Sequence, residues 1–278
     1  EDIDAIKHEV FLMRKLQHPN IARFIDFFDE KDHMYVVMEY LEGGCLFDRI
    51  VKKKQYTELT ARDLIYIFLI ALKHCHDKGV IHRDLKPENI ILASLKDDTD
   101  VKIADFGLSI EDGETTKELR TGACGTPLYL APEMIKAAAG KNGGKPYGKE
   151  IDLWAVGCLA YILLSGYPPF YMDDNDHNNK TLYKNILNGR YDMQTKQLMN
   201  VSEGAQDLIR GLLQVDPKRR LTVEQALAHP WVNAARETLA ARNLHANLKT
   251  FRAFRGRQKF RAGVKALIAT HRLKAVLK

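Results

Sequence analysis

The most informative eight residues of this 278-residue chain are His82-Arg83-Asp84-Leu85-Lys86-Pro87-Glu88-Asn89. Asp105, which opens Asp105-Phe106-Gly107, follows Asp84 by 21 residues, and Glu133, which ends Ala131-Pro132-Glu133, follows Asp105 by 28. A three-residue motif such as Asp-Phe-Gly is weak by itself, since its ordinary explanation is a turn. Three motifs in this order, one of them eight residues long, are not a coincidence.

With these motifs the sequence resembles the eukaryotic protein kinases, over about Glu1 to Val232. The resemblance implies an α+β fold of two lobes, with a mostly helical C-terminal lobe and an incomplete sheet in the N-terminal lobe. We expect residues 1–42 to form part of the N-terminal lobe and the hinge, and residues 43–232 the C-terminal lobe. Residues 233–278 are expected to form a regulatory tail.

The hydrophobic pattern agrees with this order of elements. Apolar residues at roughly helical spacing predict a helix over Glu1–Gln17. β-Branched and aromatic residues predict strands over Ile21–Asp29 and Met34–Leu41, and the polar residues between them favour a hairpin. Strands ahead of helices are typical of an α+β protein.

Further along the chain, an apolar helix is predicted over Thr60–Lys78, with a capping box over Thr60–Asp63 at its start. Two short strands are predicted over Ile90–Ala93 and Val101–Ala104. The chain after Pro132 is expected to be mostly helical.

The resemblance implies a catalytic role for five residues. Phosphoryl transfer needs a metal-bound triphosphate and an aligned nucleophile. Asp84 would accept or orient the proton of the substrate hydroxyl, Lys86 would neutralise charge on the γ-phosphate, and Thr126 would help to seat the acceptor. Asn89 and Asp105 offer the hard oxygen ligands that Mg²⁺ prefers. The alternative for each is a solvated loop residue, which the joint pattern disfavours.

ATP and Mg²⁺ are therefore the expected cofactors, and Lys86 is typical of serine/threonine rather than tyrosine kinases. The hinge backbone is expected to bind adenine, behind Met38 as the gatekeeper. The candidates for binding the nucleotide are Glu39, Leu41, Glu88, Ile91 and Asp105.

The resemblance also implies three structural roles. Glu133 and Arg220 are expected to form a buried ion pair. Asp152 is expected to hold the backbone of the 82–89 loop, and Glu9 stands where the glutamate of the regulatory helix belongs.

The chain departs from the kinase pattern in two places. Its first glycine is Gly43, so neither a glycine-rich loop nor a Val-Ala-Ile-Lys strand precedes Glu9. We expect these elements to lie ahead of Glu1 in a longer protein, and this chain to bind ATP poorly. The alternative is a catalytically impaired, pseudokinase-like scaffold. The second departure is Cys45, which stands where relatives commonly carry a glutamate that binds a substrate arginine. Glu88 supplies part of that interaction, so we expect protein substrates with basic residues near the serine or threonine.

The positive charge of the chain is concentrated at its end. Residues 236–278 carry a net charge of +11, which leaves −5 for the rest of a chain whose net charge is +6. A tail of this kind binds something acidic.

Several short motifs, among them Gly166-Tyr167-Pro168-Pro169-Phe170 and His229-Pro230-Trp231-Val232, resemble the calcium/calmodulin-dependent kinase group. Phe260, Leu267 and Leu273 have a 1-8-14 spacing in a basic segment, as in helices that bind calmodulin. We expect calcium-loaded calmodulin to bind residues 251–277, and the resemblance implies that this segment folds back as an autoinhibitor.

Three other partners compete for this tail. It could lie on an anionic membrane or form a solvated arm. Nucleic acid is disfavoured, because no nucleic-acid module accompanies the charge.

The remaining features favour an intracellular protein. The apolar runs fall short of the roughly 18–20 residues that a transmembrane helix needs. The four cysteines are scattered, which indicates a reduced, cytoplasmic protein without a cysteine metal site.

Overall fold

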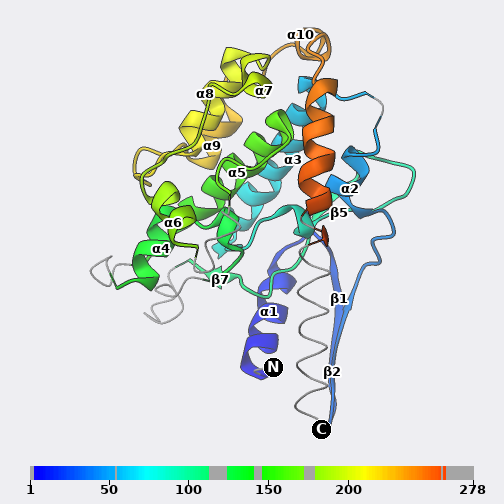
Figure 1. Ribbon diagram of the computed structural model, residues 1–278. Coiled ribbons are helices and arrows are strands. Elements are labelled where there is room, and N and C mark those ends of the chain that lie inside the picture. The colour runs from blue at the N-terminus through cyan, green and yellow to red at the C-terminus, as the bar shows by residue number, and fades with distance from the viewer. Residues whose placement is uncertain are drawn as a thin grey trace, which may run out of the picture.

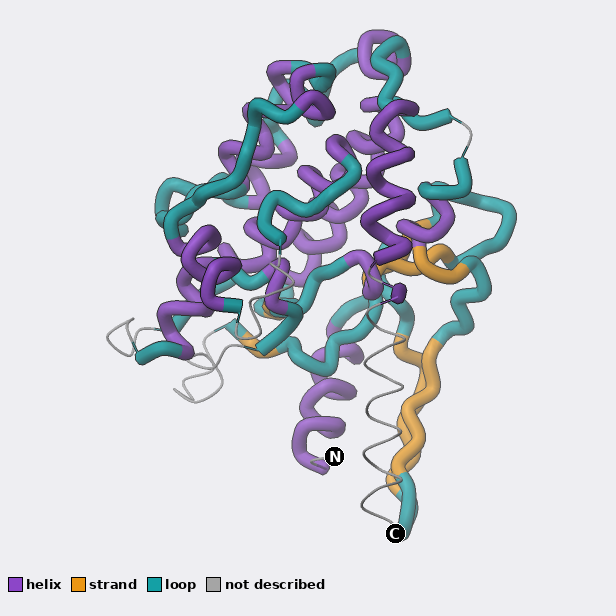
Figure 2. The backbone as a smooth tube through the Cα atoms, viewed as in Figure 1, coloured by secondary structure: helices purple, strands orange, loops and turns teal. Residues whose placement is uncertain are grey.

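The computed structural model describes residues 3–53, 55–112, 124–140, 146–171, 179–257 and 259–260. Helices dominate, and the described strands form three small sheets (Figure 1, Figure 2). The strands are β1 (Phe24–Asp29), β2 (Met34–Met38), β3 (Gly44–Cys45), β4 (Val80–Ile81), β5 (Ile90–Leu92), β6 (Val101–Ile103) and β7 (Ile110–Glu111).

The helices are α1 (Ile3–Lys15), α2 (Leu46–Ile50), α3 (Glu58–Asp77), α4 (Pro132–Ala138), α5 (Glu150–Ser165), α6 (Lys180–Leu187), α7 (Lys196–Met199), α8 (Glu203–Leu212), α9 (Val223–Leu227) and α10 (Arg236–Ala240), with 3₁₀ turns η1 (Pro87–Asn89) and η2 (Pro127–Tyr129). A further helix covers residues 245–257 and includes 259–260. We call it the tail helix, and residues 82–89 the catalytic loop.

The N-terminal lobe consists of α1 and the β1–β2 hairpin, at one end of the molecule (Figure 1). Val10, Leu12 and Met13 bury one face of α1. β1 and β2 are antiparallel, with Phe24 opposite Met38, and most of their side chains are exposed. Among the described residues this sheet has two strands. The predicted helix, hairpin and incomplete sheet are therefore confirmed.

α5 is the centre of the C-terminal lobe. Every residue from Ile151 to Ser165 is buried. A helix that is apolar on all sides is stable only when other elements surround it, and α3 and α8 pack against α5. The helix ends at Gly166, whose φ of 89° is the left-handed conformation that favours glycine.

α3 begins earlier than the sequence pattern predicts. The prediction placed its start at Thr60, with a capping box to Asp63, whereas the helix begins at Glu58 with Thr57 as its N-cap. The hydroxyl of Thr57 accepts the N–H of Thr60 at 3.4 Å, and the carboxylate of Asp63 binds the side chain of Arg62. The capping-box prediction is wrong, because the extended backbone that a cap requires is at Thr57.

β5 and β6 bring the two catalytic segments together. The strands are antiparallel and pair Ile90 with Ile103. The catalytic loop ends at Asn89, directly before β5, and Ala104 and Asp105 directly follow β6. The N–H of Ala104 donates to the carbonyl of Asn89 at 2.9 Å. The register of this hairpin therefore places Asp105 beside the end of the catalytic loop, and the two strand predictions are confirmed to within one residue.

The hydrophobic core extends beyond residue 232. Leu239, Leu244, Leu248 and Phe251 are all buried. The N–H of Leu244 donates to the carbonyl of Tyr56 at 2.8 Å, just ahead of α3. The tail helix, drawn in orange, lies against the C-terminal lobe next to α2 and α3 (Figure 1). No described helix is both long and apolar enough to cross a membrane.

Candidate functional site

One buried carboxylate holds the catalytic loop in place. Asp152 on α5 accepts hydrogen bonds from the backbone N–H groups of His82 and Arg83, both at 3.0 Å, and contacts the ring of His76 at 2.9 Å. Burial by itself raises the pKa of Asp152, but its interactions with His76 and His82 bring the pKa below the usual value. The ionised carboxylate thus holds Arg83, whose φ of 67° is uncommon for a residue with a side chain. The predicted role of Asp152 is confirmed.

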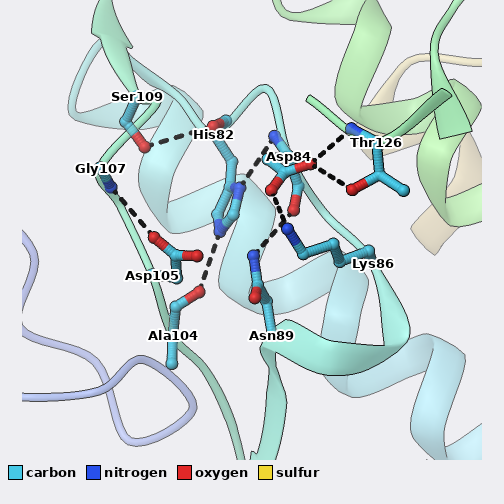
Figure 3. Close-up of polar contacts among 9 residues, drawn as sticks. All are labelled: His82, Asp84, Lys86, Asn89, Ala104, Asp105, Gly107, Ser109 and Thr126. Atoms are coloured by element: carbon cyan, nitrogen blue, oxygen red, sulfur yellow. Dashed lines mark hydrogen bonds and ion pairs between the residues drawn. The ribbon is translucent and has the colours of Figure 1, made fainter. Parts of the chain in front are cut away.

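Asp84 is the meeting point of the site (Figure 3). Its carboxylate accepts the backbone N–H of Thr126 at 2.9 Å and the Thr126 hydroxyl at 3.2 Å. The ammonium of Lys86 forms an ion pair with the same carboxylate. The structure therefore brings Asp84, Lys86 and Thr126 together, although 42 residues separate Asp84 from Thr126. An anionic oxygen next to an ammonium and a hydroxyl can orient an incoming hydroxyl group for attack.

Asn89 and Asp105 supply the oxygen ligands of the site. The amide nitrogen of Asn89 donates to the backbone carbonyl of Asp84 at 3.0 Å, and no described residue donates to its amide oxygen. Asp105 has a φ of 66°, and one of its carboxylate oxygens accepts the N–H of Gly107 at 3.4 Å. Both side chains therefore keep acceptor capacity, and their donor chemistry fits Mg²⁺.

No group of three or more His, Cys, Asp or Glu side chains suited to a metal occurs among the described residues. Mg²⁺ sites with one or two protein ligands are completed by phosphate oxygens and water. The pair Asn89 and Asp105 therefore fits a metal that arrives with a nucleotide better than a permanently bound ion.

His82 connects the catalytic loop to the segment after β6, a role that sequence reasoning missed. Its two ring nitrogens lie 3.3 Å from the N–H of Asp84 and 3.4 Å from the carbonyl of Ala104. The ring also packs on Phe106, with centroids 4.8 Å apart. Burial lowers the pKa of His82, so the ring is neutral at pH 7 and can accept at one nitrogen while it donates at the other. The only signal in the sequence is its position at the start of the motif.

α1 approaches the same region through Glu9. A Cβ atom built on Gly107 would lie 3.4 Å from a carboxylate oxygen of Asp105 and 3.5 Å from one of Glu9. Glu9 therefore lies beside the Asp105-Phe106-Gly107 segment, where the resemblance predicts the glutamate of the regulatory helix.

The predicted ion pair of the C-terminal lobe is confirmed. Arg220 donates to both carboxylate oxygens of Glu133, at 2.7 and 3.0 Å. Its guanidinium also donates to the carbonyls of Glu150 and Gln214 and lies over the ring of Trp154. The pair ties α4, which follows the Thr126 segment, to the start of α5 and the turn before α9.

The hinge candidates lie between β2 and β3. The N–H of Glu39 donates to the carbonyl of Arg23 at 2.9 Å, and its carboxylate accepts the N–H of Arg23 at 2.6 Å and pairs with Lys102 at 3.2 Å. Leu41 and Ile91 are half-buried. The Glu39 side chain is thus engaged by β6 and the start of β1, which leaves the hinge backbone as the element for a nucleotide.

The tail helix occupies an acidic subsite next to the catalytic loop. Arg255 donates to Asp48 at 2.8 and 3.1 Å and to Glu88 at 2.9 Å, and it lies 3.5 Å from the sulfur of Cys45. Lys259 forms a second ion pair with Asp48, at 2.8 Å. Glu88, a nucleotide candidate from the sequence, therefore binds the tail in this structure.

The electrostatics of this subsite favour a cation. Burial tends to raise the pKa of Asp48, but hydrogen bonds and charge from Lys259 and Arg255 bring it below the usual value. Burial also raises the pKa of the Cys45 thiol, so the thiol contributes no negative charge. The acceptors of the subsite are the carboxylates of Asp48 and Glu88. Sequence reasoning missed Asp48, whose only signal is its place on α2, one turn after Cys45.

Apolar contacts hold the rest of the tail helix. Phe251 is buried and packs edge-on against Phe47 of α2, with ring centroids 5.6 Å apart. Asn247 donates to the carbonyl of Leu164 at 2.6 Å, at the end of α5. Phe260 is exposed, and the other two residues of the 1-8-14 pattern lie outside the described residues, as does the rest of the predicted calmodulin segment beyond residue 260.

Comparison with known proteins agrees with this site. The family model for the protein kinase domain matches residues 1–232. The chain is 43% identical over 265 residues to calcium/calmodulin-dependent protein kinase type 1 of Macrobrachium nipponense, which covers 93% of this chain and 72% of the relative.

The enzyme of the same name in Caenorhabditis elegans is 44% identical over 230 residues, which covers 83% of this chain and 62% of the relative. The type IV enzyme of Mus musculus is 40% identical over 276 residues, which covers 98% of this chain and 55% of the relative. The chain thus spans between 55% and 72% of the length of these three relatives.

Proposed function

The chain belongs to the protein kinase family, in its calcium/calmodulin-dependent serine/threonine group, and on this basis we propose that it transfers the γ-phosphoryl group of ATP to serine and threonine residues of proteins, under control of its tail helix. The observation that carries the proposal is the arrangement around Asp84, whose carboxylate is bound by Lys86 and by Thr126.

The catalytic residues have separate tasks in this proposal. An acceptor hydroxyl seated beside Thr126 lies within reach of Asp84, which orients the hydroxyl and takes its proton. The ammonium of Lys86 compensates negative charge next to Asp84, where the transferred phosphate arrives. Because little covalent chemistry is required of the protein, alignment of these groups supplies most of the catalysis.

Asn89 and Asp105 would hold Mg²⁺, and the hinge backbone at Glu39 and Leu41 would bind adenine near Ile91. Bound Mg²⁺ would neutralise the charge of the ATP phosphates. The support for this assignment is chemical: both side chains keep oxygen acceptors, and the hairpin register of β5 and β6 brings the two residues together.

The tail helix is proposed to limit access of substrates, and calcium-loaded calmodulin to remove it through residues 251–277. Three features support this regulation. Arg255 occupies the acidic subsite of Asp48 and Glu88 beside the catalytic loop. The segment is strongly basic, and the relatives are named as calcium/calmodulin-dependent kinases. The same subsite supports a preference for substrates with an arginine near the phosphorylated residue. The free cysteines support an intracellular location.

The rival function, a pseudokinase-like scaffold, has no support from the relatives, which are named as kinases. The chain has no glycine before Gly43, but the residues around Asp84 are complete. No observation favours the scaffold over the enzyme.

Phosphate transfer tests the proposal directly. We expect Mg²⁺-dependent transfer from labelled ATP to a serine peptide with an upstream arginine, and a higher rate with calcium-loaded calmodulin. Asp84→Asn is expected to lower the rate by about 10²–10⁴-fold. Asp97→Asn, on the exposed loop before β6, is the matched control and leaves the rate unchanged. Equal rates for the two variants would refute the assignment of Asp84.

A further inference from the structure

A pocket of about 510 Å³ lies on the outer side of the hinge, apart from the residues that surround Asp84. The loop between α1 and β1, the start of β1, the residue after β2 and Lys102 of β6 line it. The volume lies within the range of sites that hold small organic molecules. Lys102 and Glu39 are mostly buried in it, with side chains 12% and 19% exposed, whereas Arg23 and Ile25 on β1 or just before it are exposed.

The polar groups of this pocket are mainly hydrogen-bond donors. The ammonium of Lys102 uses two of its three donors, on the carbonyl of Pro19 at 2.9 Å and on Glu39 at 3.2 Å. The guanidinium of Arg23 makes no hydrogen bond or ion pair with any described residue, so its five donors are available. Two cations face one carboxylate, and the pocket has a net charge of +1 when His18 is neutral.

His18 adds a further donor. Its Nδ1 accepts the backbone N–H of Asn20 at 3.1 Å, so in the neutral ring the proton is on Nε2. Burial, the neighbouring His74 and Lys102 lower the pKa of His18, which keeps the ring neutral at pH 7.

Glu39 is the acceptor in this set, and one of its oxygens is already committed. Both the backbone N–H of Arg23 and the ammonium of Lys102 contact its Oε1 atom. The apolar part of the lining comes from Pro19, Phe24 and Ile25. A ligand that matches this arrangement carries an anionic group for the cations, an apolar body, and one N–H or O–H group for the remaining oxygen of Glu39.

We propose that this pocket binds a small organic carboxylate with an apolar body, held by Arg23 and Lys102. The carboxylate would accept from the guanidinium, whose planar donors match a carboxylate in two parallel hydrogen bonds, and from the third donor of Lys102. The apolar body would cover Phe24 and Ile25. The proposal does not depend on kinase activity, because none of the residues around Asp84 lines the pocket.

The test uses N-acetyl-L-phenylalanine as the probe and N-acetyl-L-phenylalaninamide as its uncharged counterpart, with ligand-observed NMR on the full chain. The acid is expected to bind with a dissociation constant on the order of 1 mM or tighter, and the amide about tenfold more weakly. Arg23→Gln is expected to weaken binding of the acid about tenfold. Because Arg23 is exposed and makes no side-chain contact with the described residues, this variant should fold normally.

Lys31→Gln is the matched control, since Lys31 is an exposed cation in the β1–β2 turn outside the pocket. This control should bind the acid as the parent chain does. The proposal is overturned if the acid does not bind at 10 mM (about ten times the expected constant), if acid and amide bind equally, or if Arg23→Gln and Lys31→Gln have the same affinity. The last two outcomes would mean that contact with the apolar hairpin alone captures the probe.

Discussion

Replacement of Arg255 by alanine tests how the tail helix is held. The guanidinium is 7% exposed and makes three charge-assisted hydrogen bonds, two to Asp48 and one to Glu88. Such bonds contribute about 1.5–3 kcal/mol each when buried. Asp48 is 26% and Glu88 45% exposed, so water compensates much of the loss. We expect a net cost of about 2–3 kcal/mol for docking, which is a factor of roughly 30–150 in the docking equilibrium.

Hydrogen exchange of the amides in residues 245–257 measures this equilibrium. If the helix exchanges through undocking, its protection falls by the same factor in Arg255→Ala. Calmodulin affinity is expected to rise, by no more than that factor, because the variant spends more time in the undocked state that calmodulin binds.

Arg257→Ala is the control for this comparison. Arg257 belongs to the same helix and carries the same charge, but it is exposed and forms no ion pair with the described residues. Its exchange should match that of the parent chain, and its calmodulin affinity reports the loss of one positive charge alone. Equal protection in the two variants would refute the view that Arg255 anchors the tail.

Three further outcomes follow from buried or strained positions. Glu133→Gln leaves the buried guanidinium of Arg220 without its counter-charge, and urea unfolding should show a loss of about 3–5 kcal/mol; a loss below 1 kcal/mol would contradict this. Gly166→Ala places a Cβ about 2.5 Å from the carbonyl oxygen of Asn247 at a φ of 89°, so thermal unfolding should occur at a lower temperature and exchange of the tail helix should be faster, whereas unchanged values would show that the backbone relaxes freely. Burial lowers the pKa of His74; a lowered pKa in the folded state gives stability that is present above pH 6.5, the pKa of the unfolded chain, and lost as the pH falls, so His74→Gln should reduce the acid loss of unfolding free energy between pH 7.5 and 5.5.

Much of the catalytic site could be predicted because its residues lie in short motifs. Asp84, Lys86 and Asn89 fall within six residues of one another, and a loop this short between two strands leaves few ways to arrange them. The identity of the motif therefore indicates the chemistry, and the structure adds the distances. The boundaries of α3 were less predictable, because Thr57 and Thr60 are equally good caps by residue type and the extended backbone at Thr57 distinguishes them.

Contacts between distant segments were beyond local reasoning. Asp105 meets the catalytic loop through the register of β5 and β6, and Asp152 reaches His82 from 70 residues away. The resemblance predicted the second contact, but no periodicity in the chain indicates it. Such contacts depend on how helices and strands pack, which a local pattern does not encode.

The tail shows the same division. Its charge and amphipathic pattern are visible in the sequence, and they predict an acidic partner. That the partner for Arg255 is Asp48, 207 residues earlier, together with Glu88, was decided by the tertiary structure alone. The physical reason is that a cation binds whichever carboxylates the fold brings within about 3 Å, and the packing of Phe251 and Leu248 into the core sets where Arg255 lies.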